Sequence, residues 1–282
     1  MTEQSDKTHC TTKDFLVSGE SFSLVWNEDQ KILITQPQPL KENLNKYYES
    51  NEYISHTDSK KGLINFLYQA VKNYSLKRKL RLIEKLHLGK GSLLDIGAGT
   101  GDFLKYAKDN NWEVNGVEVN ASARSLSLNK GIQLKESIEE CKGNQFDVVT
   151  LWHVLEHLPD LQNTVLNIEA LVKEGGTLIV AVPNFNSYDA KFYKEFWAAY
   201  DVPRHLWHFS QESMKMLFSS KMTLVKTKPM IFDAFYVSLI SEKYKNGNTF
   251  SLKAFWIGLR SNLSAWKTKE YSSLIYIFKK AN

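Results

Sequence analysis

Short apolar runs alternate with stretches of helical periodicity between residues 92 and 182, and this alternation limits the possible folds most strongly. Strand–helix units at this spacing are typical of a parallel sheet with helices on both faces. The expected strands are 92–96, 113–119, 132–134, 146–151 and 177–182, and the expected helices are 102–110, 121–129 and 161–172. Two further strands are expected near 223–228 and 274–278, as an antiparallel final pair. The predicted fold is therefore α/β, with a doubly wound, mostly parallel seven-stranded sheet.

The remaining segments predict how the chain is divided. The expected parts are a disordered tail (1–13), a small β module (14–40), an N-terminal helical segment (41–91) and the sheet domain (92–282). The β module is inferred from apolar runs at 15–17, 22–26 and 32–35. Within the sheet domain we expect an aromatic insertion at 185–209 and a helical insertion at 232–270.

Charge and composition exclude several classes of protein. The net charge is +5 and the basic residues are dispersed, apart from a run at 77–81 that is expected to form a solvated helix face. Nucleic acid is therefore not expected as a partner. No apolar run reaches the roughly 18–20 residues of a membrane span. Two distant cysteines, Cys10 and Cys141, do not suggest a disulfide framework, and a reducing cytoplasm is the expected location.

A glycine-rich loop, Asp95-Ile96-Gly97-Ala98-Gly99-Thr100-Gly101, follows the first expected strand of the sheet and opens a helix. Glycines there allow a sharp turn and close approach of the backbone to a ligand, and the helix start offers free N–H groups. A dinucleotide-binding loop would prefer G-x-G-x-x-G, whereas this chain has G-x-G-x-G. Glu118, at the end of the second strand, can accept hydrogen bonds from both hydroxyls of a ribose.

These residues resemble the first and second motifs of class I S-adenosylmethionine (SAM)-dependent methyltransferases, and the resemblance covers about residues 75–230. The run at 146–160, which contains Leu155-Glu156-His157, is similar to the branch that includes quinone-biosynthetic and sugar methyltransferases. Residues 14–40 are similar to a zinc-ribbon segment of some relatives. Trp26-Asn27-Glu28-Asp29 stands where a C-x-x-C would be expected, so no zinc is expected in this module.

The resemblance implies SAM as the cofactor, S-adenosylhomocysteine as the product, and a role for each matching position. The implied contacts are Asp95, Gly97, Ala98, Gly99 and Gly101 for the methionine part, Glu118 for the ribose, Val119 and Asn120 for the adenosine, Ser137 and Ile138 for the adenine, and Leu151, Trp152 and His153 beneath the sulfonium.

Histidines near the expected methyl group are the first candidates for catalysis. His153 is the first candidate general base, because it follows the strand that would end beneath the sulfonium. His153 and His157 are four residues apart and would share a face of a helical turn. The alternative is that Glu156 and His157 brace the loop. A zinc site would need further ligands, so no metal is expected.

The aromatic insertion is the second candidate region for the acceptor, and it suggests a lid or an apolar pocket, with ordinary core packing as the alternative. Within it, the run at 201–210 resembles bacterial methyltransferases linked to glycan or small-metabolite pathways. Arg204 is expected to hold an anionic group of the acceptor, or else to pair with a carboxylate that fixes the loop. His205 is a second candidate base.

Two further segments leave alternatives open. Tyr47, Tyr48, Tyr53 and His56 are expected either to reach the cofactor or to lie on the surface. The apolar residues of 232–267 are expected to pack against the core or a partner in a homodimer, or else to contact a membrane surface. The predicted function is methylation of a small-molecule acceptor, on oxygen, with carbon as the alternative atom. The acceptor is expected to be either a sugar or glycan precursor or a quinone or phenol. A SAM-binding module without catalysis is the alternative.

Overall fold

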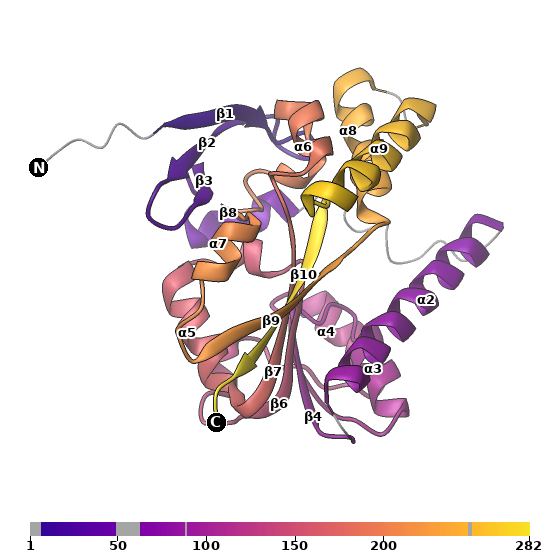
Figure 1. The fold of residues 1–282 in the computed structure, drawn as a ribbon. Helices are drawn as coiled ribbons and strands as arrows, with labels where there is room; N and C mark the ends of the chain where they lie inside the picture. Colours follow the sequence, from indigo (N-terminus) through magenta and orange to yellow (C-terminus); the bar gives the residue numbers. More distant parts are fainter. Residues whose placement is uncertain (1–6, 49–62, 88, 248–249) are drawn as a thin grey trace, which may run out of the picture.

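The computed structural model describes residues 7–48, 63–87, 89–247 and 250–282, which form two sheets with helices around them (Figure 1). The strands are β1 (Thr8–Lys13), β2 (Ser21–Asn27), β3 (Ile32–Gln36), β4 (Ser92–Ile96), β5 (Glu113–Val117), β6 (Phe146–Trp152), β7 (Val172–Pro183), β8 (Trp207–His208), β9 (Met222–Pro229) and β10 (Ser273–Lys280). The α-helices are α2 (Leu63–Leu86), α3 (Asp102–Asp109), α4 (Ala121–Leu128), α5 (Leu161–Leu171), α6 (Tyr188–Tyr193), α7 (Gln211–Met216), α8 (Asp233–Asn246) and α9 (Leu252–Thr268). Short 3-10 helices are η1 (Lys41–Tyr48), η3 (Ile138–Cys141), η4 (Leu155–His157), η5 (Lys194–Phe196) and η6 (Ala198–Tyr200).

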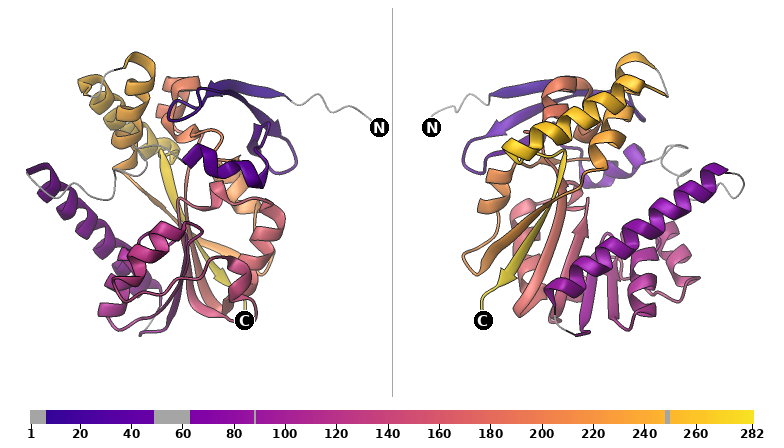
Figure 2. Two further views of the ribbon diagram at one scale, coloured as in Figure 1. Left: turned by 180° about the vertical axis from the view of Figure 1, so that it is seen from behind. Right: turned by 45° about the vertical axis from the view of Figure 1, so that its right-hand side comes forward.

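The larger sheet has the strand order β5-β4-β6-β7-β10-β9. The first four strands are parallel, and β10 is antiparallel to both of its neighbours, β7 and β9. Successive residues of the strands face opposite sides, so that Leu93 and Val148 pack below α2 and α3 while Leu94 and Val149 pack against α5. Figure 2 shows α2 and α5 on opposite faces of this sheet. The doubly wound, mostly parallel sheet with an antiparallel last strand is thereby confirmed.

One predicted strand is absent, so this sheet has six strands within the described residues. At 132–134 the chain forms no strand, and only an isolated bridge joins Val117 to Lys135. Ile132 is instead bonded to the end of α4, because its N–H donates to the carbonyl of Ser127 at 3.1 Å and its carbonyl accepts from the Ser127 hydroxyl at 2.9 Å. Beyond the bridge, the Glu140 carboxylate accepts from the N–H groups of Glu136 and Ser137, so pairing does not continue there.

The smaller sheet corrects two expectations about the N-terminus. Residues 8–13, predicted to be disordered, form β1, which pairs with β2. Residues 15–17, predicted to be extended, form a turn because the Asp14 carboxylate accepts hydrogen bonds from the N–H groups of Leu16, Val17 and Ser18. The sheet, ordered β1-β2-β3-β8, takes its fourth strand from the aromatic insertion. The N-terminal module is therefore completed by residues far along the chain.

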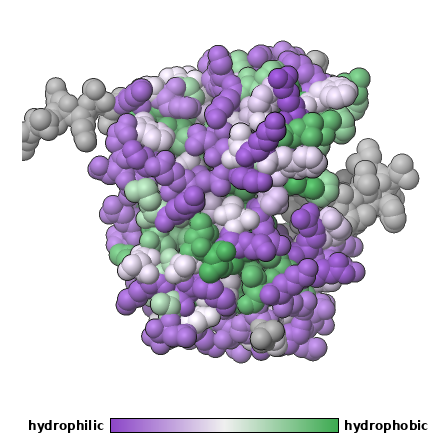
Figure 3. Space-filling view, viewed as in Figure 1, coloured by the Kyte–Doolittle hydropathy of each residue, from purple (hydrophilic) through white to green (hydrophobic). Residues whose placement is uncertain are grey.

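The helical insertion forms a hairpin of α8 and α9 above one end of the larger sheet (Figure 1). Its inner side is buried at Ala254, Ile257 and Ala265, whereas Trp256 and Trp266 are 66% and 70% exposed. Apolar side chains accordingly lie on the surface over these two helices (Figure 3). The expectation that this stretch packs against the core therefore holds for one face only. Among the described residues, no helix is both long and apolar enough to cross a membrane.

Candidate functional site

The glycine loop forms a turn at the C-terminal end of β4, where ligands bind in open α/β sheets. Gly97 and Gly99 have φ values of +74° and +55°, a region that side chains with a Cβ rarely adopt. A Cβ on Gly97 would lie 2.3 Å from Val154, whereas a Cβ on Gly99 would meet no described atom within 4 Å. The turn therefore presents bare backbone to open space, and no described side chain caps the N-terminus of α3 behind it.

Glu118 follows β5 and lies beside this turn. Its Oε2 accepts a hydrogen bond from the N–H of Gly99 at 2.8 Å, and its Oε1 accepts one from the N–H of Asn120 at 2.9 Å. The carboxylate is thus fixed by two backbone groups and remains partly exposed. Val119 is 74% exposed beside it, and Asn120 caps α4 through a side-chain hydrogen bond from Ala123. This placement suits the contacts expected for a nucleoside.

Asp95 lies at the buried base of the loop and is only 3% exposed. Its Oδ1 accepts a 2.5 Å hydrogen bond from the hydroxyl of Thr150 on β6. Burial raises the pKa of Asp95 to about 6, against the opposing effects of Lys79 and this hydrogen bond. The hydrogen bond to Thr150 ties the end of β4, where the glycine loop begins, to β6.

Lys79 on α2 is a residue of this site that the sequence analysis placed on a solvated face. Its Nζ lies 4.5 Å from the ring centre of Trp152 and 5.6 Å from that of Phe103. Burial lowers the pKa of Lys79, while the charges of Asp95 and Asp233 raise it. A signal was present in the sequence, because Lys79 lies three residues after Leu76 and four before Ile83, and so on the apolar face of α2.

The other expected cofactor residues lie either at the end of β6 or at the start of η3. Leu151 is fully buried in β6, and the half-buried Trp152 packs edge-on against Phe103 at the end of that strand. Ser137 and Ile138 begin η3, just beyond the bridge that joins Lys135 to the end of β5. The chain thus brings the glycine loop, Glu118 and the Ser137–Ile138 segment to the C-terminal edges of β4 and β5.

His153 follows β6 with a φ of +57°, and this unusual backbone bend directs its side chain toward α8. Its Nε2 lies 3.2 Å from Asp233, and its Nδ1 lies 3.4 Å from Glu156. Burial alone would lower the pKa of His153, but the two carboxylates outweigh burial and raise the pKa to about 10. At neutral pH His153 is therefore an imidazolium, a state that disfavours the expected role as general base.

Of the two roles expected for Arg204, the contacts in the structure are those of the second, a pair with carboxylates that fixes the loop, and not those of a free anion-binding group. The side chain is 1% exposed, and its guanidinium is held by Asp14 at 2.9 Å, by Asp201 at 2.7 Å and by the carbonyl of Tyr47 at 2.9 Å. Burial lowers the pKa of Arg204, but Asp201 and Asp14 more than compensate and raise it. Because its charge and its donors are already matched, Arg204 fixes the 201–206 loop against the smaller sheet.

His205 comes next in the chain and lies beside the residues that follow β6. Its ring and that of His157 meet edge-to-face, with centroids 4.5 Å apart. Burial and the neighbouring His157 lower the pKa of His205 well below its usual value, so it is a weak base. Tyr48 also contacts His157, because its hydroxyl lies 3.2 Å from His157 Nδ1. Tyr47, in contrast, is buried against Phe22. Tyr53 and His56 lie outside the described residues.

Taken together, the parallel sheet, the glycine turn after β4 and the anchored acid after β5 define a nucleoside-binding α/β domain. The methyltransferase-domain family matches residues 50–220 in sequence. The chain therefore belongs to the class I SAM-dependent methyltransferases.

Two similar curated proteins share one name, ubiquinone biosynthesis O-methyltransferase. The protein from Coxiella burnetii is 30% identical over 118 residues, which are 38% of this chain and 50% of that protein. The protein from Klebsiella pneumoniae is 35% identical over 104 residues, which are 33% of this chain and 43% of that protein. The chain thus spans about half the length of the curated relatives that it matches.

A solved structure, that of Haemonchus contortus phosphoethanolamine N-methyltransferase 2 in complex with S-adenosyl-L-methionine, shares the fold. It superimposes with a TM-score of 0.54 at 12% identity, covering 100% of this chain and 71% of the other.

Proposed function

We propose that this protein transfers a methyl group from SAM to an oxygen atom of a small-molecule acceptor. The observation that carries the proposal is the Glu118 carboxylate, which two backbone N–H groups hold beside the open glycine turn. A carboxylate in this position is suited to bind both hydroxyls of a ribose, and it disfavours a 2′-phosphate.

The residues around the loop fit SAM. The open space above Gly99 admits a ligand against the backbone, and Glu118 would hold its ribose. Val119 offers an apolar surface beside the adenosine, and Ser137 and Ile138 would contact the adenine. Asp95, Gly97, Ala98 and Gly101 would surround the methionine part, and Trp152 would lie beneath the sulfonium. When bound, SAM supplies an activated methyl group, so the protein chiefly has to position the acceptor and exclude water.

For the acceptor side we propose His153 as the contact residue. The bend after β6 places His153 at the same edge of the sheet as the glycine loop. Its Nε2–H faces Asp233, whereas its Nδ1–H makes no hydrogen bond to Glu156 at 3.4 Å and would hold an acceptor oxygen in place. The relatives named as O-methyltransferases of ubiquinone biosynthesis support an oxygen acceptor that is quinone-like or phenolic, and a sugar hydroxyl is the alternative.

Calorimetry with SAM and S-adenosylhomocysteine, followed by detection of S-adenosylhomocysteine formed with phenolic and sugar acceptors, tests this proposal. Binding of both ligands and turnover with an oxygen acceptor are the expected results. A lack of affinity for either ligand at millimolar concentration would contradict the proposal. Binding without turnover on any acceptor would favour a SAM-binding module without catalysis, which the extensive pairing of Arg204 and His153 also allows.

A further inference from the structure

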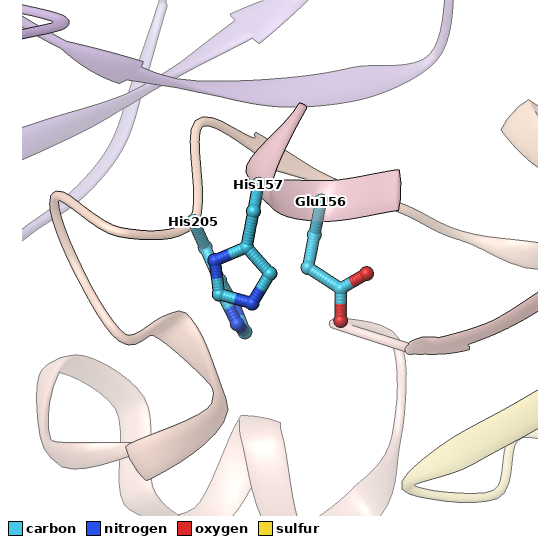
Figure 4. Close-up of side chains that lie close together, drawn as sticks. All are labelled: Glu156, His157 and His205. Atoms are coloured by element: carbon cyan, nitrogen blue, oxygen red, sulfur yellow. The ribbon is translucent and has the colours of Figure 1, made fainter. Parts of the chain in front are cut away.

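Three side chains with metal-ligating atoms meet beside the proposed acceptor site. Glu156 and His157 come from η4, which follows β6, and His205 comes from the loop that precedes β8. One ligand atom from each residue lies within 4.8 Å of those of the other two. Figure 4 shows the three side chains extending into the same space beneath η4.

Backbone carbonyls determine which nitrogen of each imidazole is available. His157 Nδ1 lies 3.0 Å from the carbonyl oxygen of Arg204, and His205 Nδ1 lies 2.9 Å from that of Ala199. A carbonyl oxygen only accepts, so both Nδ1 atoms carry the proton and both Nε2 atoms keep their lone pairs. Metal-bound histidines in proteins are oriented in this way, by a hydrogen bond from the nitrogen that does not bind the metal.

Glu156 supplies the negative charge, and its environment is unusual. The residue is 1% exposed, and neither carboxylate oxygen has a hydrogen-bond partner among the residues that the structure describes. The nearest cation, His153 Nδ1, lies 3.4 Å from Oε1. A buried carboxylate without hydrogen bonds is costly, and each such group calls for an explanation such as a bound ion.

The backbone around the cluster is held by further hydrogen bonds. The carbonyl of Glu156 accepts from the N–H of Leu206 at 2.8 Å, and the carbonyl of His205 accepts from the hydroxyl of Thr35 at 2.6 Å. Asp201 is the other acid near His205, at 4.0 Å from Nε2, but it is already bound to Arg204. These bonds fix the backbone of Glu156 and His205 at the place where the two sheets meet.

We propose that Glu156, His157 and His205 bind a divalent transition-metal ion, and that Zn²⁺ suits this set of ligands best. Two histidines and one glutamate are the protein ligands of many zinc sites that keep an open coordination position. At bond lengths of 2.0–2.2 Å, tetrahedral ligand atoms lie about 3.4 Å apart, so only small side-chain movements are needed. The open position would accept an oxygen ligand from water or from an acceptor. The inference does not depend on the proposed methyl transfer.

The primary test is metal content. We would strip the full-length protein with a chelator, reload it with Zn²⁺, remove free metal by gel filtration and measure bound zinc by mass spectrometry. The expected result is one zinc per chain for the wild type, and an affinity at least about tenfold lower for Glu156→Gln and His205→Gln. His87→Gln is the matched control, because His87 lies outside the cluster, and it should retain the metal. Zinc at less than one-tenth of an equivalent in the wild type, or equal zinc in all variants, would overturn the proposal.

A second measurement separates a metal site from a purely structural cluster. Cobalt-loaded wild type should show the visible absorption of a tetrahedral or five-coordinate ion, and Glu156→Gln should lose it. Adding zinc should raise the melting temperature of the wild type, and it should raise that of Glu156→Gln much less, because this variant lacks the charged ligand. No change in melting temperature on adding zinc to the wild type would contradict the proposal, and binding of S-adenosylhomocysteine by the same samples reports on the proposed function separately.

Discussion

Glu118 is the residue whose charge is most directly tied to the proposed cofactor recognition, because its two oxygens already have one backbone donor each and keep further acceptor capacity. We expect Glu118→Gln to weaken binding of S-adenosylhomocysteine by roughly 10- to 100-fold, since a hydrogen bond to a charged group contributes about 1.5–3 kcal/mol. Calorimetry gives the dissociation constant. Glu113→Gln makes the same change at an exposed position at the other end of β5 and should leave affinity within about twofold. Equal affinities for the two variants would rule out this role of Glu118.

The protonation of His153 gives a second prediction at the residue scale. Because its pKa is raised to about 10, the wild-type imidazole should stay protonated at pH 8 in NMR spectra of the side chain. Removing one carboxylate with Asp233→Asn should lower this pKa. The ion pairs add stability that is fully present below pH 6.5 and is lost as the pH rises through about 10. A neutral wild-type imidazole at pH 8 would show that Asp233 and Glu156 do not act as described.

The local geometry of the proposed cofactor site was easier to predict from the sequence than the contacts around the proposed acceptor site. Gly97 and Glu118 were predictable because the backbone turn and the strand end restrict the residue type locally. The pairing of Arg204 with Asp14 could not be predicted, because these two residues are 190 positions apart in the sequence. A basic residue looks the same in sequence whether it faces a ligand, a buried carboxylate or water.

At the scale of elements, Arg204 joins the β1–β2 turn to the loop before β8. We expect Arg204→Met to lower the free energy of unfolding by about 3–5 kcal/mol, because it leaves Asp14 buried without its partner. Urea denaturation measures this change. Arg81→Met, at an exposed position on α2, is the control and should change the free energy by less than about 0.5 kcal/mol. A similarly small effect of Arg204→Met would mean that water replaces the ion pair.

The elements that sequence patterns identified were those with local signals. β2 and β3 were predicted from runs of β-branched and aromatic residues next to a turn. β1 is polar, and β8 has two residues, so both exist only through pairing with strands already in place. At 132–134 the local signal was misleading. Ile132 is apolar, which suggests a strand, but it is buried without pairing in a β-ladder.

At the scale of the whole molecule, the two sheets are joined by the bridge between Asn184 after β7 and Phe209 after β8, and by the hydrogen bond from Leu206 to the carbonyl of Glu156, so we expect one unfolding transition. S-adenosylhomocysteine at 100 times its dissociation constant should stabilise the folded state by about 2.7 kcal/mol, which raises the melting temperature by roughly 5 °C. Scanning calorimetry or a fluorescence melt measures the shift. Glu118→Gln at the same ligand concentration should show a smaller shift. Two separate transitions, with only one sensitive to the ligand, would mean that the sheets unfold independently.

The position of β10 between β7 and β9 affects the order in which this protein is assembled during synthesis. The chain makes β7 and β9 long before β10, yet neither pairs with the other. Until residues 273–280 leave the ribosome, the edge of β7 that will pair with β10 has free N–H and C=O groups. The same strand carries the apolar side chains of Leu178, Val180 and Val182. Such an edge is a template for pairing with other chains. The nascent protein is therefore most exposed to aggregation just before its central antiparallel strand is inserted.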